Sequence, residues 1–155
     1  MMRRLIVGAA LGACTPARVP PPPPLTPAAQ VIEQQRKWDA ANVRDYAFTY
    51  RDRCFCPGSF VWVRITVSDG KVSNAELTDT TSYGFHHTSE FRRPTVDSLF
   101  VWVVNAYTRN AERVDVRYDR TFHFPIEAMM DGKLNVIDDE FAFEVRDFTR
   151  GPSKR

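Results

Sequence analysis

The stretch that decides the fold is 61–77, with the sequence VWVRITVSDGKVSNAEL. Aliphatic residues alternate with other residues over 61–67, which is the two-residue period of a β-strand with one buried face. Asp69 and Gly70 follow, and this dipeptide favours the left-handed conformations of a two-residue hairpin turn. The sequence therefore predicts an antiparallel hairpin in which 72–77 is the returning strand.

Strand patterns also occur on both sides of this hairpin. The predicted strands are 46–51, 61–67, 72–77, 114–118, 124–130, 133–137 and 141–145. Asp131 and Gly132 repeat the Asp-Gly turn signal between two of them and predict a second tight hairpin. Because hairpins connect antiparallel neighbours, we expect an antiparallel sheet of about five to seven strands.

A first helix is predicted from Pro27 to about Val43. Thr26 suits the capping position before the helix, and proline is favoured at the first helical position. Trp38 lies among apolar residues at helical spacing, so we expect it to anchor the helix in the core.

A second helix is predicted over 96–107, where apolar residues recur at helical spacing after a capping Thr95. The β-branched residues within 99–104 favour a strand instead, but the helical period holds over about three turns. The resulting prediction is a single α+β domain over 27–149, with both helices packed on one face of the sheet.

The first residues of the chain are typical of an export signal. Arg3 and Arg4 precede an apolar run at 5–11, which is much shorter than the roughly 18–20 residues of a membrane-spanning helix. The Leu-Gly-Ala-Cys sequence ending at Cys14 resembles the lipobox of bacterial lipoproteins. That resemblance implies removal of 1–13 and a diacylglyceryl group on the Cys14 thiol. The alternative is an ordinary signal peptide in which the cysteine occurs by chance.

A proline-rich stretch separates Cys14 from the predicted domain. Residues 20–24 are all proline, so we expect 14–26 to form an extended linker without a core of its own. Several acyl chains together would anchor the protein stably in a membrane. Thr15 stands where an inner-membrane retention signal of some bacteria would place aspartate. By resemblance to those sorting rules, we expect the cell envelope, at the outer membrane facing the periplasm.

Charge excludes one class of partner. The chain has 21 Lys and Arg against 19 Asp and Glu, and without Arg3 and Arg4 the two sets are equal at 19. The only basic stretch left is 150–155, which we expect to be a disordered tail. No nucleic-acid partner is predicted, because such proteins carry a basic patch or stripe.

The cysteines form a pair once Cys14 is assigned to lipid. Cys54 and Cys56 would lie about 6.6 Å apart on a strand, near the upper limit for a disulfide. A structural disulfide is expected in an oxidising compartment. A redox-active pair, metal-binding thiolates and free buried thiols remain alternatives.

Three histidines and one acidic set are the other candidate ligands. His86, His87 and His123 could join the two thiolates in a soft-metal site, but their spacing matches no zinc-finger pattern. The alternative is solvated loop histidines. The acidic residues Asp131, Asp138, Asp139 and Glu140 lack the calcium-loop pattern and are better explained as turn residues.

No catalytic residue and no cofactor are predicted. The sequence has no G-x-S-x-G elbow, no phosphate-binding loop and no H-E-x-x-H pair. Trp62 and Trp102 lie off the main apolar faces of their predicted elements. They form either a second buried layer or an interaction surface.

Several motifs together resemble one family. They are Trp38, Tyr46–Tyr50, Cys54–Pro57, Val67–Val72, Thr95–Phe100, Val116–Asp119, Phe124–Glu127 and Asp138–Glu140. In this order, over Gln35 to Phe148, they resemble the bacterial lipoproteins of the domain-of-unknown-function family 6174. Its usual form carries glycine where this chain has His123. The resemblance implies an exported lipoprotein with an α+β domain, and it implies no activity.

The sequence thus predicts a lipid-anchored cell-envelope protein with a non-enzymatic binding or structural domain. Its partners would be the membrane, through the anchor, and an envelope protein or ligand. The alternative is a thiol-redox or metal-handling lipoprotein that uses Cys54 and Cys56 with a nearby histidine.

Overall fold

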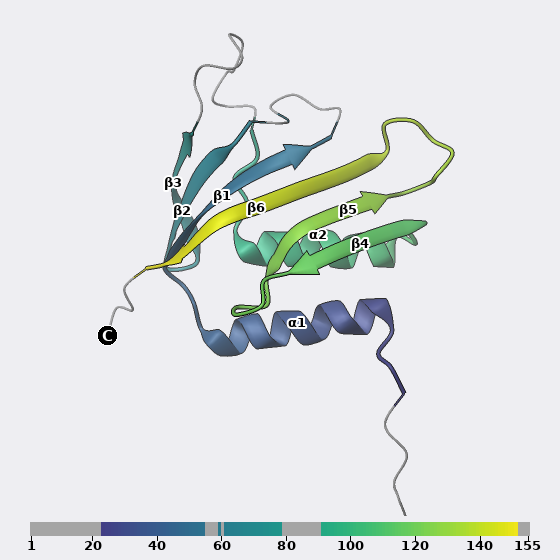
Figure 1. The fold of residues 1–155 in the computed structure, drawn as a ribbon, viewed down its shortest axis with the longest axis horizontal. Coiled ribbons are helices and arrows are strands. Elements are labelled where there is room, and N and C mark those ends of the chain that lie inside the picture. The colour runs from purple at the N-terminus through teal and green to yellow at the C-terminus, as the bar shows by residue number, and fades with distance from the viewer. Residues whose placement is uncertain (1–22, 55–58, 60, 79–90, 152–155) are drawn as a thin grey trace, which may run out of the picture.

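The computed structural model describes residues 23–54, 59, 61–78 and 91–151. Its elements, in chain order, are α1 (Pro27–Ala41), β1 (Tyr46–Arg53), β2 (Val63–Ser68), β3 (Lys71–Leu77), α2 (Val96–Thr108), β4 (Arg113–Tyr118), β5 (Pro125–Asp131) and β6 (Glu140–Arg150) (Figure 1). None of the helices in this part of the chain is long and apolar enough to span a membrane.

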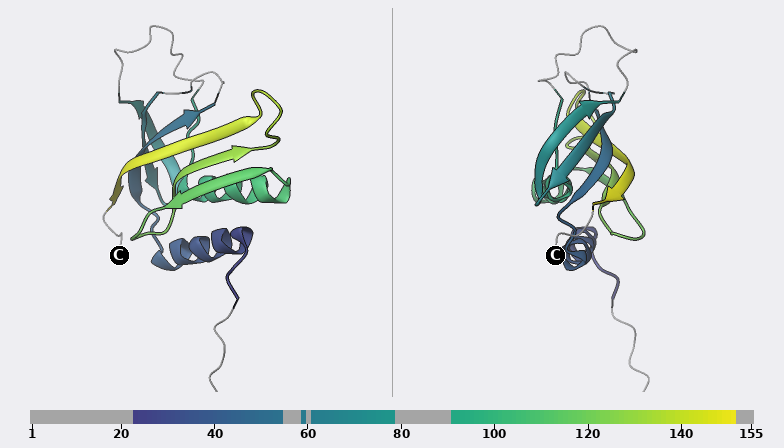
Figure 2. Two further views of the ribbon diagram at one scale, coloured as in Figure 1. Left: turned by 45° about the vertical axis from the view of Figure 1, so that its right-hand side comes forward. Right: turned by 90° about the vertical axis from the view of Figure 1, so that its left-hand side faces the viewer.

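The six strands form one antiparallel sheet in the order β3-β2-β1-β6-β5-β4. The α+β class and the antiparallel sheet are therefore confirmed. The last strand, β6, lies in the middle of the sheet between β1 and β5 and joins two hairpins from distant parts of the chain. The sheet is strongly twisted, and β3 and β4 form its two edges (Figure 2).

Helix α2 packs against the sheet through the apolar residues that the helical period predicted. Leu99, Phe100 and Val103 are fully buried, and the helix contacts β4 and β5. Thr95 and Ser98 form a reciprocal capping box at its start, which satisfies backbone donors that have no partner within the helix. The helical prediction for this segment is confirmed.

Helix α1 lies beside α2 (Figure 1), and the two helices are joined through Trp38. The indole Nε1 of Trp38 donates a hydrogen bond to Asp97 Oδ1 at 2.9 Å. Thr26 caps the helix, with Pro27 in the first turn, as predicted. The packing of both helices on one face of the sheet stays a prediction, because α2 is the element that α1 mainly contacts.

The first hairpin has the predicted turn. Asp69 and Gly70 connect β2 to β3, and both have the positive φ angles of a left-handed turn, 52° and 73°. Arg44 supports the turn, since its Nε donates to Asp69 Oδ1 at 2.8 Å.

The second predicted hairpin turn at Asp131 and Gly132 is wrong, and so is the strand at 133–137. Asp131 pairs with Glu140, so 132–139 is a longer connection, here called the β5–β6 loop. Carboxylates accept hydrogen bonds from the backbone N–H groups that would pair with a neighbouring strand if this segment were a strand. Asp139 Oδ2 accepts from the backbone N–H of Lys133, and Glu112 Oε2 accepts from that of Leu134, both at 2.9 Å.

His123 keeps the backbone conformation that glycine would adopt. Its φ is 65°, in the left-handed region, within the turn between β4 and β5. Asp119 Oδ1 holds this turn by accepting hydrogen bonds from the N–H groups of Thr121 and Phe122 at 2.8 and 2.6 Å. The turn therefore forms without glycine, with His123 in a conformation that is costly for a residue with a side chain.

Candidate functional site

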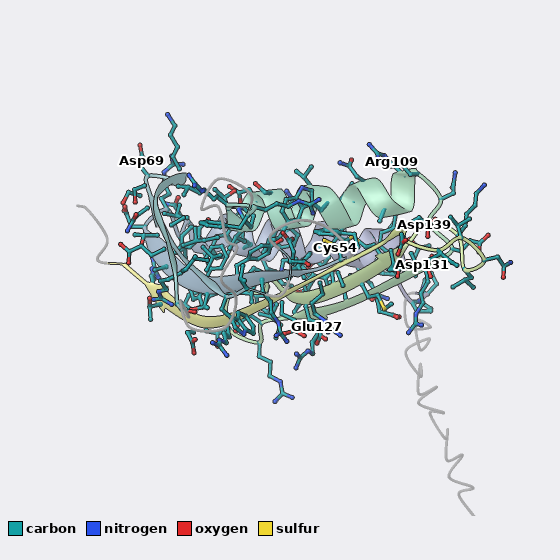
Figure 3. The ribbon with its side chains drawn as sticks, turned by 90° about the horizontal axis from the view of Figure 1, so that it is seen from above. Cys54, Asp69, Arg109, Glu127, Asp131 and Asp139 are labelled. Carbon is teal, nitrogen blue, oxygen red and sulfur yellow. The ribbon has the colours of Figure 1, made fainter. Side chains whose placement is uncertain are left out.

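A pocket of about 500 Å³ opens where α2 ends and β5 passes into β6. It is lined by Arg92, Trp102, Asn105, Ala106, Arg109, Ala111, Met130, Gly132, Asp139 and Phe141. Figure 3 shows Arg109, Asp131 and Asp139 together at this end of the molecule. The residues come from three separate parts of the sequence, and only the fold brings them together.

One side of the pocket is aromatic and carries a cation. The rings of Trp102 and Phe141 meet edge to face, with centroids 5.5 Å apart. The guanidinium carbon of Arg92 lies 4.3 Å from the centroid of Phe141 and 5.6 Å from that of Trp102. Attraction between the cation and the ring faces helps to hold Arg92 at the pocket.

A buried carboxylate also holds Arg92. Asp52 is only 3% exposed, and its Oδ1 lies 3.7 Å from Nη1 of Arg92. Tyr50, also buried, donates its hydroxyl hydrogen bond to the same carboxylate oxygen. Asp52 and Tyr50 lie two residues apart on β1, so their side chains share the inner face of the sheet.

Burial controls the protonation of these two groups. It raises the pKa of Asp52 above its ordinary value of 3.8, although the Tyr50 hydrogen bond and the Arg92 charge act in the opposite direction. Burial likewise raises the pKa of Tyr50, and the neighbouring Asp52 charge adds to this effect. Tyr50 therefore stays a protonated hydrogen-bond donor at neutral pH.

The raised pKa of Asp52 predicts a pH-dependent stability. Between 3.8 and the higher folded pKa, the folded protein binds more protons at Asp52 than the unfolded chain does. The contribution of Asp52 to the free energy of unfolding is therefore largest below 3.8 and decreases as the pH rises through the folded pKa. Asp52→Asn removes this titration, so the free energy of unfolding of the variant minus that of the wild type should increase with pH.

Urea unfolding of both proteins from about pH 3 to pH 7 measures this difference. The other carboxylates are common to both proteins, so their titration cancels. A difference that stays constant, or that decreases with pH, would contradict the raised pKa.

Arg109 supplies the second cation of the pocket. It follows the last residue of α2, and it has no ion pair or side-chain hydrogen bond within the part of the chain that the structure describes. Asp139 is the opposing charge, but its Oδ2 already accepts from the backbone of Lys133. Two arginines lining a pocket with an aromatic and aliphatic wall can bind an anionic group that is attached to an apolar body.

The sequence-predicted site residues are not gathered at this pocket. Cys14, Cys56, His86 and His87 lie outside the described residues. Cys54 follows directly after β1, and the proposed Cys54–Cys56 bridge stays a prediction. His123 lies just before the start of β5. Cys54 lies level with the opposite end of β5, because its neighbour Arg53 pairs with a β6 residue that in turn pairs near the end of β5. About 20 Å of strand therefore separates His123 from Cys54.

No group of three potential metal ligands occurs in residues 23–54, 59, 61–78 and 91–151. Of the four acidic residues predicted to be turn residues, Asp138 and Asp139 lie in the β5–β6 loop, whereas Asp131 and Glu140 are paired strand residues at its two ends, so the turn prediction is wrong for these two. The Oδ1 atom of Asp131 is buried and has no hydrogen-bond partner among the described residues. Burial and the nearby Asp139 and Glu140 carboxylates raise the pKa of Asp131.

Sequence reasoning missed both arginines of the pocket. Neither Arg92 nor Arg109 belongs to a recognisable motif, and the pocket depends on the placement of β6 beside β5. The one available signal was Trp102, which the helical pattern placed off the main apolar stripe. The structure shows it half-buried in contact with Phe141 and Tyr50, which supports the second buried layer at this position.

Comparison with known proteins gives a family and no individual relative. No curated protein and no solved structure matches the chain. One family model, described as a family of unknown function (DUF6174), matches residues 30–150, which include all the strands and α2. The chain belongs to this family.

Proposed function

We propose that the protein is a lipid-anchored component of the bacterial cell envelope that binds an anionic ligand without transforming it. The ligand would have an acidic group for Arg92 and Arg109 and an apolar body for Trp102 and Phe141. The observation that carries the proposal is one pocket whose lining combines Arg92, placed over the Trp102 and Phe141 rings, with a second arginine, Arg109.

The size and construction of the pocket support this proposal. A volume of about 500 Å³ suits a small organic ligand. Arg92 is held in place by Asp52 and by two aromatic rings, so little side-chain entropy would be lost when it binds an anion. Arg109 is free to pair with the same ligand, since it has no ion pair among the described residues.

An aromatic sulfonate can test the pocket. Titration with 8-anilinonaphthalene-1-sulfonate, followed by its fluorescence, should show saturable binding to the folded wild-type protein. Arg109→Gln should weaken this binding about tenfold, which corresponds to the loss of one charge-assisted hydrogen bond. Arg120→Gln is the matched control, because Arg120 is exposed in the turn at the other end of β5. Equal affinities of the two variants would contradict binding in this pocket.

The proposed address rests on the leader sequence and on Cys14. Lipidation of Cys14 followed by the linker 15–26 would place the domain next to a membrane outside the cytoplasm. Cys14→Ser should move the protein from the membrane fraction to the soluble periplasmic fraction of a bacterial host. A Cys14→Ser protein that remains in the membrane fraction would contradict the lipid anchor.

A further inference from the structure

The β5–β6 loop exposes three aliphatic side chains in close succession. Leu134 is 60% exposed, Val136 is 48% exposed and Ile137 is 87% exposed. The other large exposed apolar side chains among the described residues are scattered over other elements, at Leu25, Ile32, Val101 and Met129. Single exposed apolar residues are normal on a protein surface, but a group of them in one loop indicates an interaction site.

Hydrogen bonds fix the backbone that presents these side chains. The N–H groups of Lys133 and Leu134 donate to the carboxylates of Asp139 and Glu112. Val136 N–H donates to the carbonyl of Lys133 at 2.9 Å. A Cβ atom at position 132 would lie 2.8 Å from Asp139 Oδ2, so a side chain there would displace the Asp139 carboxylate that accepts from Lys133. The apolar tip is therefore a supported feature of the loop rather than a loose segment.

The loop lies at the end of the molecule at which α1 begins. In Figure 1 and in the left view of Figure 2, the β5–β6 loop and the start of α1 both lie toward the right-hand end of the molecule, the loop above β5 and β4 and the helix below them. The linker 14–26 can extend about 3.1 Å per residue, or roughly 40 Å in total. An anchor at Cys14 would thus keep this end of the domain within reach of the membrane.

We propose that the tip formed by Leu134, Val136 and Ile137 inserts into the membrane surface that holds the Cys14 anchor. This inference rests on the proposed lipid anchor. Insertion of a few aliphatic side chains is weak by itself. The tether raises the local concentration of the loop at the membrane, so weak insertion is sufficient to orient the domain.

Charge around the tip selects the kind of lipid. Acidic residues outnumber basic residues around the tip. The acidic residues are Glu112, Asp131, Asp138, Asp139 and Glu140, and the basic residues are Arg109, Arg113 and Lys133. Anionic headgroups would be repelled, so the occupant is a zwitterionic phospholipid surface. Gly132 and Asp139 line the pocket as well as the loop, so docking would turn the mouth of the pocket toward the membrane.

Tryptophan fluorescence can test the insertion. Lipidated full-length Ile137→Trp is reconstituted into phosphatidylcholine vesicles whose acyl chains carry bromine, which quenches tryptophan inside the bilayer. Lipidated Val101→Trp is the matched control, because Val101 is 51% exposed on α2. The quenching of the lipidated parent protein is subtracted, since the chain has three native tryptophans.

We expect a loss of fluorescence for Ile137→Trp and none beyond the parent for Val101→Trp. Replacing part of the zwitterionic lipid by phosphatidylglycerol should reduce this loss. Equal quenching of the two variants in protein that floats with the vesicles would overturn the insertion and leave the anchor intact. Protein that does not float would overturn the anchor and the insertion together. A concentration-dependent blue shift of Ile137→Trp without bromine quenching would overturn insertion in favour of contact between two copies of the chain.

Discussion

Replacing Trp38 by alanine is expected to lower the free energy of unfolding by about 3–5 kcal/mol, as for other buried large aromatic side chains. Trp38 is 4% exposed, and its ring lies 5.5 Å from that of Tyr46, 5.7 Å from that of Phe124 and 6.1 Å from that of Phe148. It joins α1 to the sheet and, through Asp97, to α2. The substitution therefore creates a cavity at the junction of three elements and removes a hydrogen bond.

Chemical denaturation of the two proteins at one pH measures this loss. Arg36→Ala is the matched control on the same helix, and since Arg36 is exposed, it should change the free energy of unfolding by no more than about 0.5 kcal/mol. Asp97→Ala removes the acceptor of the indole hydrogen bond while Trp38 stays in place, and it should cost only about 1 kcal/mol. A Trp38→Ala variant as stable as Arg36→Ala would show that α1 is not part of the cooperative core.

Local patterns predicted both helices and their anchors. Thr26 and Pro27 are signals that act within one turn, so they can be recognised without knowledge of the rest of the fold. In α2 the helical period and the β-branched residues favoured different structures. The period prevailed because its apolar face fills the space over the sheet, where Leu99, Phe100 and Val103 are fully buried. Burial of a whole helical face outweighs small differences in intrinsic propensity.

The strand order could not be predicted in the same way. Pairing of β1 with β6 joins Tyr46 to Arg150, and no local signal determines a contact between residues so distant in sequence. The predicted strand at 133–137 failed for a related reason. Backbone N–H groups of this segment donate to the carboxylates of Glu112 and Asp139. The local sequence pattern does not identify these two residues as the acceptors. The pocket depends on both features, so its arginines were not predictable either.

The outer face of the sheet supplies the second large effect. Glu144 accepts from Arg51 Nε at 2.7 Å and also lies 2.5 Å from Arg51 Nη2. Arg53 Nη1 donates to the other oxygen of Glu144 at 2.7 Å. The side chain of Glu144 is only 21% exposed. Its removal would leave the partly buried guanidinium group of Arg51 without this counter-charge, and Arg53 with only the more distant Glu127 at 3.8 Å.

We expect Glu144→Ala to lower the free energy of unfolding by about 2 kcal/mol, between the cost of losing an exposed ion pair and that of breaking a buried one. Urea unfolding measures it. Glu76→Ala on the edge strand β3 is the control, because Glu76 is exposed and should change the stability by at most about 0.5 kcal/mol. A cost for Glu144→Ala no larger than that of the control would mean that water solvates the arginines as well as Glu144 does.

A double-mutant cycle can separate the ion pairs from the loss of side-chain packing. Glu127 lies directly opposite Glu144 in the ladder, which would be unfavourable for two bare carboxylates. Arg53 lies between them, 2.7 Å from Glu144 and 3.8 Å from Glu127, and Arg117 pairs with Glu127 at 2.7 Å. Arg53→Met should therefore destabilise the wild type but cost clearly less in the Glu144→Gln background, because only one carboxylate then needs the cation. Equal costs in both backgrounds would show that Arg53 contributes through its aliphatic stem rather than through its charge.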